Sequence, residues 1–261
     1  MKIKVMETFA EAVADIADGA SLMVFNWNMG RSTPRNLIRA LHEQGTKDLT
    51  IISHNFAPAR AGNHSFDETD ICTALTLTGQ AKKIITAWPG GLSQHGSKGP
   101  KKSSLLERIG SGTVEMELMS HGTLAQRMHA GGSGLGGFYT PVGVGTIVAE
   151  GKEKRTIDGK EYILEKPLRA DFGFIRAFKA DTRGNLIYRG SVRGGNPVIA
   201  MASDVTIAEV DEIVEVGELD PDAIVTPGIF IQRIVKIPAG SYGSASYMQA
   251  RFRQALDASW D

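Results

Sequence analysis

The chain has 261 residues, a formal net charge of zero, 42% hydrophobic residues and a single cysteine, Cys72. Balanced charge argues against nucleic-acid binding through phosphates, and one cysteine excludes an internal disulfide and a multi-cysteine metal site. No apolar run approaches the length of a membrane span, and the first residues lack the apolar core of a secretory signal, so we expect a cytoplasmic protein.

The first half of the chain predicts alternating strands and helices. A short apolar run at 22–25 indicates the first strand. The following helix has Thr33 as its cap and Pro34 at its first position, and it ends near Gly45. Further strands are predicted at 49–52, 82–87 and 114–118, and a short amphipathic helix at 122–129.

The second half contains more strands and one insertion. Apolar runs predict strands at 171–178, 197–201, 205–208 and 213–216. Asp158 and Gly159 separate two alternating segments, which indicates a β-hairpin inserted near 152–164. Because short apolar runs alternate with helices, we expect an α/β fold, a mostly parallel sheet with helices on both faces. We predict one domain over 1–238, followed by a tail at 239–261 with a short helix.

Residues 131–146 concentrate glycine around a Phe-Tyr-Thr-Pro core. Glycine serves where the backbone takes positive φ or approaches a neighbour closely, so this stretch predicts a cavity lined by backbone. Gly132, Gly134 and Gly137 also fit the spacing of a dinucleotide-binding loop, which needs a strand before it and a helix after it. A predicted helix precedes the stretch and Pro141 opposes a helix after it, so we reject a dinucleotide site.

Polar residues follow three predicted strands, where open α/β sheets place their ligand sites. They are Asn26, Asn28 and Gly30 after the first strand, Asn55 after the second, and His121 after the strand at 114–118. The histidines show no spacing that would define a metal site, and no Gly-x-Ser-x-Gly elbow follows a strand. We therefore predict a binding edge with neither a metal ion nor a serine nucleophile.

Several motifs occur in an order that resembles one family. They are Gly122-Thr123-Leu124-Ala125 with Arg127, Ala130-Gly131-Gly132, Phe138-Tyr139-Thr140-Pro141, Leu168-Arg169-Ala170-Asp171, Asn196-Pro197, and Glu218-Leu219-Asp220-Pro221 with Thr226-Pro227-Gly228. Because of these motifs, the stretch from about residue 5 to residue 237 resembles the alpha (A) subunit of a family I coenzyme A transferase. This family includes the 3-oxoacid, 3-oxoadipate, acetate/butyrate and glutaconate types. The resemblance implies the CoA-transferase fold, which is Rossmann-like.

The resemblance implies a heteromeric enzyme that moves CoA from an acyl-CoA to a carboxylic acid, such as a 3-oxoacid. In this family a beta-subunit glutamate attacks the thioester and carries CoA as a glutamyl thioester. The chain has no Ser-Glu-Asn-Gly motif, so we expect no catalytic nucleophile in it and an α2β2 assembly with a beta subunit. Coenzyme A is then a substrate, and no tightly bound cofactor is expected. The expected substrate-binding residues are Asn26, Asn28, Gly30, Asn55, His121, Gly132, Gly134 and Phe138.

Three pocket segments depart from the family pattern. The family's Gly-Gly-Phe-Gly loop is replaced at 25–30, its Ser-Asn-Asn reads Ser-His-Asn at 53–55, and its Pro-Gln-Gly reads Ser-His-Gly at 120–122. The polar loop at 93–104 also lies outside the pattern. Because of these changes, the sequence does not determine which acyl group is transferred. They also allow a second class of function, an acyl-CoA hydrolase in which His121 activates water. A third class, a binding protein that works alone, would leave the apolar glycine-rich loop exposed.

Overall fold

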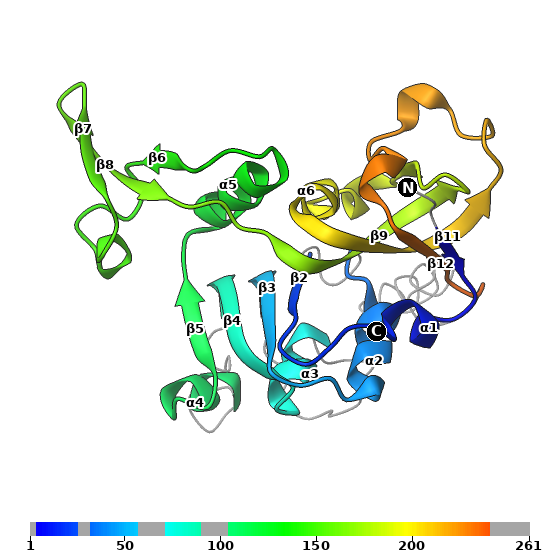
Figure 1. Cartoon of the computed structure of the whole chain (residues 1–261), viewed down its shortest axis with the longest axis horizontal. Helices are drawn as coiled ribbons and strands as arrows, with labels where there is room; N and C mark the ends of the chain where they lie inside the picture. Colours follow the sequence, from blue (N-terminus) through cyan, green and yellow to red (C-terminus); the bar gives the residue numbers. More distant parts are fainter. Residues whose placement is uncertain (1–3, 26–31, 57–70, 90–103, 241–261) are drawn as a thin grey trace, which may run out of the picture.

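The computed structural model describes residues 4–25, 32–56, 71–89 and 104–240. A nine-stranded sheet forms the centre of the molecule (Figure 1). Its strands are β1 (Lys4–Met6), β2 (Ser21–Val24), β3 (Leu49–Asn55), β4 (Ala81–Trp88), β5 (Glu115–Leu118), β9 (Ala170–Asp181), β10 (Leu186–Ile187), β11 (Ser203–Val214) and β12 (Arg233–Lys236). They follow the order β1-β12-β11-β9-β2-β3-β4-β5, with β10 beside β9.

The sheet is almost entirely parallel. Each neighbouring pair along this order runs parallel, and β10 runs antiparallel to β9. The first and second halves of the chain meet where β2 lies beside β9, with Leu22 opposite Phe172. The predicted mostly parallel sheet is thus confirmed.

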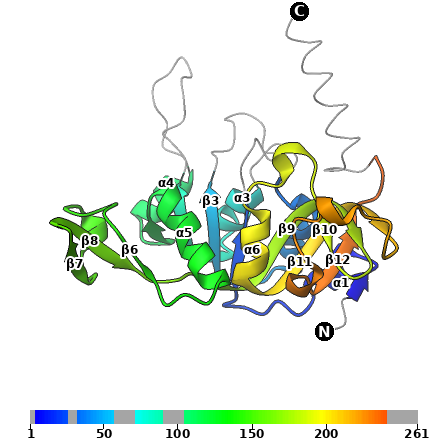
Figure 2. The same cartoon turned by 90° about the horizontal axis from the view of Figure 1, so that it is seen from above.

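Helices cover both faces of this sheet. Neighbouring strand residues point to opposite faces, so Leu22 and Ile51 belong to one buried cluster and Met23 and Ile52 to the other. The first cluster packs against α1 (Phe9–Val13), α2 (Arg35–Gln44), α3 (Ile71–Leu77) and α4 (Ser104–Gly110). The second packs against α5 (His121–Gly132) and α6 (Asn196–Ala202), which lie side by side (Figure 2). Short 3-10 turns lie at Ile147–Ala149, Gly190–Val192, Pro221–Ala223 and Gly228–Phe230.

A second, smaller sheet projects from the body of the molecule (Figure 1). It is antiparallel and consists of β6 (Phe138–Thr140), β8 (Lys160–Glu165) and β7 (Lys154–Ile157). Asp158 and Gly159 join β7 to β8 with φ angles of 50° and 76°, as a two-residue hairpin turn of type I′ requires. The predicted hairpin insertion is confirmed. We call residues 135–165 the arm.

One predicted strand is wrong, because the run at 197–201 lies in α6. Pro197 occupies the first turn of this helix, where its missing N–H is not needed. Ile199 and Ala200 are buried against the sheet. A short apolar run is typical of a buried helix as well as of a buried strand, and periodicity alone does not separate the two.

Two predicted boundaries also differ from the structure. The runs at 205–208 and 213–216 belong to one long strand, β11, which ends at Val214. Helix α2 begins at Arg35, so Pro34 takes the cap position in place of Thr33 and makes no side-chain capping bond. The carboxylate of Glu209 accepts hydrogen bonds from the amides of this first turn instead. A side chain from β11 therefore replaces the expected local cap.

Two glycines of the glycine-rich stretch lie inside α5 rather than in a loop. A Cβ on Gly131 would lie 2.1 Å from the carbonyl oxygen of Leu168, and one on Gly132 would lie 2.7 Å from Cβ of Met201 in α6. Such distances are far below van der Waals contact. These two glycines therefore allow α5 to pack closely on its neighbours.

We expect Gly132→Ala to lower the free energy of unfolding by about 2 kcal/mol, because the added methyl group overpacks the α5–α6 contact. Gly122→Ala in the same helix is the matched control, since a Cβ there meets nothing within 4 Å. Alanine at that helical position should raise stability by about 0.5–1 kcal/mol. Urea denaturation of both variants tests this, and equal stability of the two would contradict the packing argument.

Some sequence predictions fall outside the described residues. They concern Asn26, Asn28 and Gly30, most of the polar loop at 93–104, and the short helix expected in the tail. Within the described ranges, no helix is both long enough and apolar enough to cross a membrane.

Candidate functional site

The carboxyl ends of the parallel strands meet at one edge of the sheet, where the sequence predicts substrate-binding residues. β3 ends at Asn55, and β2 is followed directly by Phe25. Two residues separate the end of β5 from His121, the first residue of α5. The strands bring these residues to the same edge, because β2, β3, β4 and β5 follow one another in the sheet.

Asn55 and His121 are in contact. Nε2 of His121 lies 3.1 Å from Oδ1 of Asn55, and because an amide oxygen only accepts, Nε2 carries the proton and donates it. Asn55 is fixed by its pairing with Trp88 in β4. The start of α5 is fixed by Ser120, whose hydroxyl oxygen accepts a hydrogen bond from the amide of Thr123 at 3.1 Å. The structure therefore brings together two residues that the sequence predicts separately.

A row of rings supports this contact from the side. The His54 ring stacks on the His121 ring with centroids 6.3 Å apart and an interplanar angle of 20°. His54 also meets Phe25 edge to face, with ring centroids 5.3 Å apart. His54 is 8% exposed and Phe25 is 6% exposed, so the row runs from the buried sheet to the exposed His121.

Burial keeps His54 neutral. Removal from water lowers the pKa of His54 from 6.5 to about 4, and the nearby His121 ring acts in the same direction. The backbone carbonyl of His54 accepts a hydrogen bond from the Thr86 hydroxyl at 3.2 Å. At neutral pH, the imidazole of His54 is therefore an uncharged packing surface for the His121 ring.

A pair of glycines before α6 holds Phe25 in place. A Cβ on Gly194 would lie 2.1 Å from the Phe25 ring, and one on Gly195 would lie 2.6 Å from it. Only bare backbone fits against this ring. Phe25 belongs to the pocket segment 25–30 that the sequence singles out, whereas Gly194 and Gly195 were not predicted as parts of the edge, although the Gly-Gly pair directly before Asn196-Pro197 was an available signal.

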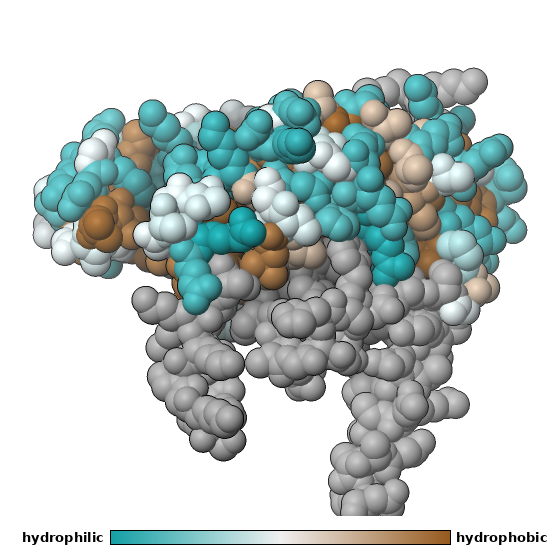
Figure 3. All heavy atoms as spheres, turned by 90° about the horizontal axis from the view of Figure 1, so that it is seen from below, coloured by the Kyte–Doolittle hydropathy of each residue, from teal (hydrophilic) through white to brown (hydrophobic). Residues whose placement is uncertain are grey.

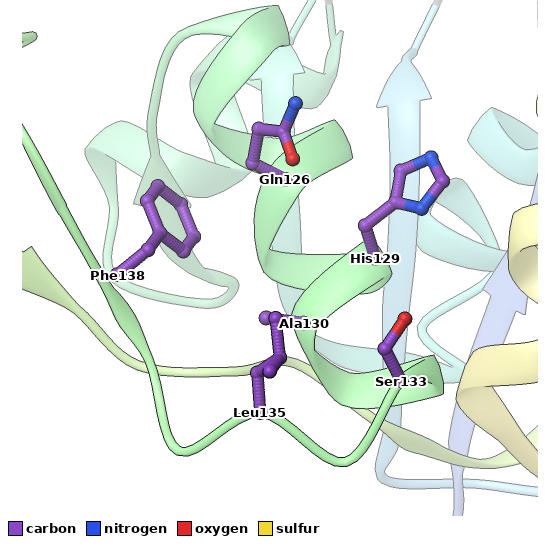
Figure 4. A pocket seen from close by; sticks show the side chains of 6 residues that line it. All are labelled: Gln126, His129, Ala130, Ser133, Leu135 and Phe138. Carbon is purple, nitrogen blue, oxygen red and sulfur yellow. The ribbon is translucent and has the colours of Figure 1, made fainter.

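Beside this edge, the outer side of α5 borders a pocket of about 330 Å³ (Figure 4). Its lining comes from α5 and from the glycine-rich stretch that follows: Gln126, His129, Ala130, Ser133, Leu135 and Phe138. Figure 4 shows Phe138 across the pocket from the α5 side chains. Phe138 is a predicted site residue, whereas Gln126 and His129 were missed. Their spacing of three along an amphipathic helix places both on one face and was the signal available.

The remaining predicted site residues do not gather at one point. Gly134 lies in the turn after α5 with φ of 71°, next to the pocket residues Ser133 and Leu135. Gly132 packs against Met201. Asn55 and His121 form the separate cluster at the sheet edge. In the described ranges, no group of three or more histidine, cysteine, aspartate or glutamate side chains is arranged to hold a metal ion.

A buried charged network lies behind this edge. Glu209 of β11 is fully buried, and one of its carboxylate oxygens accepts hydrogen bonds from the amides of Asn36 and Leu37 at the start of α2. Its other oxygen lies 3.3 Å from the guanidinium of Arg176, which also binds Asp211. Burial raises the pKa of Glu209, while Arg176 and the two amides favour its charged form. The network fixes the first turn of α2 to the centre of the sheet.

Comparison with known proteins gives a consistent result. The family model described as coenzyme A transferase matches residues 6–237. The chain is 42% identical to the A subunit of the 3-oxoadipate CoA-transferase of Pseudomonas putida, over 92% of this chain and 96% of that protein. It is 44% identical to the alpha subunit of the acetate CoA-transferase of Escherichia coli K12, over 90% of this chain and 97% of that protein.

The fold is also found in a solved structure. An acyl-CoA transferase from Escherichia coli O157:H7, crystallised as a thioester complex with CoA, superimposes with a TM-score of 0.73 at 22% identity. The match covers 92% of this chain and 48% of that longer chain. At this identity the likeness concerns the fold. Because the family model matches residues 6–237 and the relatives are more than 40% identical over nearly their whole length, the chain belongs to the coenzyme A transferase family.

Proposed function

We propose that this chain is the alpha subunit of a heteromeric CoA-transferase, which moves CoA from an acyl-CoA to a free carboxylic acid. The observation that carries the proposal is the family match over residues 6–237, joined to full-length relatives at 42–44% identity that are named as A or alpha subunits. Those names imply a second subunit. We propose a beta-type partner, an α2β2 assembly and a cytoplasmic location.

The proposed substrates are acyl-CoA thioesters and short carboxylic acids, with 3-oxoacids first among them. Relatives are named for 3-oxoadipate, acetate and succinyl-CoA:3-ketoacid transfer. Coenzyme A passes through the reaction as a substrate, and the proposal needs no tightly bound cofactor. The pocket formed by α5 and Phe138 combines apolar and polar side chains, which suits a short acyl chain with a polar end.

The proposed chemistry divides between two chains. A glutamate carboxylate of the partner attacks the thioester carbonyl, the C–S bond breaks, and an acyl-glutamyl anhydride forms as CoA leaves as thiolate. The thiolate attacks the glutamyl carbonyl, releases the first acid and leaves a glutamyl thioester, and an acceptor acid reverses these steps. This chain contributes donors for the developing oxyanion, with Asn55 first among them, and a wall that keeps water from the anhydride. Asn26, Asn28, Gly30 and Gly134 stay proposed substrate contacts.

The arm offers a surface for the partner. Leu135, Val142, Ile147 and Ile157 are exposed on it, Ile147 to 79% of its full surface. Figure 3 shows hydrophobic patches at the arm end of the molecule between hydrophilic residues. Apolar side chains gathered on a projecting element are typical of a surface that another protein covers. We propose that the beta-type subunit contacts the arm and so completes the pocket.

Co-expression of this chain with the beta-type subunit of its source tests the function. We expect the complex, but neither chain alone, to transfer CoA from an acyl-CoA to an added acid, with mass spectrometry reading out acyl-CoA/acid pairs. Borohydride reduction or hydroxylamine should trap the glutamyl thioester on the partner. CoA release that does not depend on an acceptor acid would contradict transfer and identify the complex as a hydrolase.

A further inference from the structure

We propose that His121 is a positioning residue that orients the side chain of Asn55, so that the Asn55 amide group donates to the substrate carbonyl oxygen. The inference rests on the proposed CoA transfer and goes beyond it, because it gives His121 a role through a neighbour rather than as a base. The observation that carries it is the hydrogen bond from Nε2 of His121 to Oδ1 of Asn55 at 3.1 Å.

This hydrogen bond determines which way the Asn55 amide faces. The amide is planar, with an oxygen that only accepts on one side and an NH2 group that only donates on the other. Because His121 binds the oxygen, the NH2 group is turned away from His121. The backbone of Asn55 is already fixed by its pairing with Trp88, but the final torsion of an asparagine side chain has broad preferences. The hydrogen bond from His121 fixes this torsion and so favours one orientation of the amide.

The His121 ring is itself held from two sides. Its backbone lies at the capped start of α5, where Ser120 binds the amide of Thr123. Its ring stacks on His54, which packs against Phe25. Because burial keeps His54 uncharged at neutral pH, it supports the ring without placing a positive charge beside it. The ring plane of His121, and with it the direction of the Nε2 proton, is thus defined by β2, β3 and α5.

The same hydrogen bond makes two possible roles of His121 distinguishable by experiment: it can position Asn55, or it can act on the substrate directly. A proton that Nε2 donates to Asn55 is not available to the thioester oxygen at the same time. If His121 instead acted on the substrate directly, its contribution would be independent of Asn55. If His121 acts directly, the losses of kcat caused by changing His121 and Asn55 should multiply. If His121 only positions Asn55, changing both residues should cost no more than changing Asn55 alone.

A double-mutant cycle on the complex with the beta-type subunit tests the proposal. We expect Asn55→Ala to lower kcat about 100-fold, as for loss of one oxyanion donor, and His121→Ala to lower it about 10-fold, both with little change in KM. The double variant should lose about 100-fold and no more. His121→Gln should recover most of the activity, because its amide NH2 donates to the same oxygen. Effects that multiply to about 1000-fold, or a His121→Ala enzyme with full activity, would overturn the proposal.

One further variant and one further measurement complete the test of this positioning role. Asn55→Asp removes the donor with little change of shape, so it replaces Asn55→Ala if that variant fails to fold. Nitrogen NMR of the imidazoles in the chain alone should show His121 protonated at Nε2, with signals that shift in Asn55→Ala while those of His129 do not. This readout does not need transfer activity. A wild-type complex without transfer but with this signature refutes the proposed function alone, and unshifted His121 signals refute the positioning role.

Discussion

Replacing Glu209 by alanine is expected to lower the free energy of unfolding by about 3–5 kcal/mol. The carboxylate is fully buried, binds two amides at the start of α2, and pairs with Arg176, which is itself almost fully buried. Its removal leaves the first turn of α2 without its acceptor and takes one of two acidic partners from a buried cation. Breaking a buried pair by deleting one member usually costs this much, because the remaining charge stays desolvated.

A second glutamate on the same strand provides a matched control. Glu212 also lies on β11 and pairs with Lys179 at 2.7 Å, but both side chains are substantially exposed. Exposed pairs contribute less than about 1 kcal/mol, so Glu212→Ala should be nearly neutral. Urea denaturation monitored by circular dichroism measures both variants. Similar losses in the two would mean that the burial of Glu209 does not set its contribution.

Replacing His54 by asparagine, the residue that the family pattern has there, should make the chain less sensitive to acid. The unfolded chain protonates His54 near pH 6.5, whereas burial holds the folded pKa at about 4. Between these values only the unfolded state takes up the proton, so stability falls as pH drops through this range. One pKa unit corresponds to about 1.4 kcal/mol, so the loss reaches about 3 kcal/mol in full and about 2 kcal/mol by pH 5.

Denaturation at pH 7 and pH 5 gives this quantity by difference. Wild type should lose about 2 kcal/mol more than His54→Asn between the two values, because the substitution removes the buried imidazole whose pKa is lowered by folding. His129→Asn, which changes an exposed histidine of α5, is the control and should follow wild type. Parallel pH dependence of wild type and His54→Asn would show that folding does not lower the pKa of His54.

The sequence predicted those elements best whose structure depends on interactions between residues close together in the chain. Alternating segments around Asp158 and Gly159 need positive φ in a two-residue turn, so the hairpin followed from its own residues. The apolar runs of β3 and β4 likewise identified strands without knowledge of their partners. The run at 197–201 failed because its assignment depended on what it packs against, since a buried helix and a buried strand have the same composition.

Single residues of the candidate site could be predicted from the sequence, but the contacts between them could not. Asn55 and His121 each follow a strand, which marks them singly, whereas their contact depends on β4 lying between β3 and β5. Glu209 belongs to a run, 206–210, that fits the family pattern, but its contacts were not predictable, because its partners at the start of α2 lie more than 170 positions away. Contacts of this kind are created by the strand order, which the pattern of apolar residues does not determine.

The pairing of β2 with β9 has a consequence for synthesis of the chain. Leu22 pairs with Phe172, which is made 150 positions later, and β1 pairs with the still later β12. At 5–20 residues per second, a ribosome needs roughly 8–30 s to deliver β9, while hairpins and helices form within microseconds. Strands β3 to β5 are made during that interval, and we expect them to pair with β2 into a half-sheet whose edge at β2 has no neighbour until β9 arrives. We expect this half-sheet to be the nascent species that chaperones bind, and the speed of translation across residues 120–170 to govern the yield of folded protein.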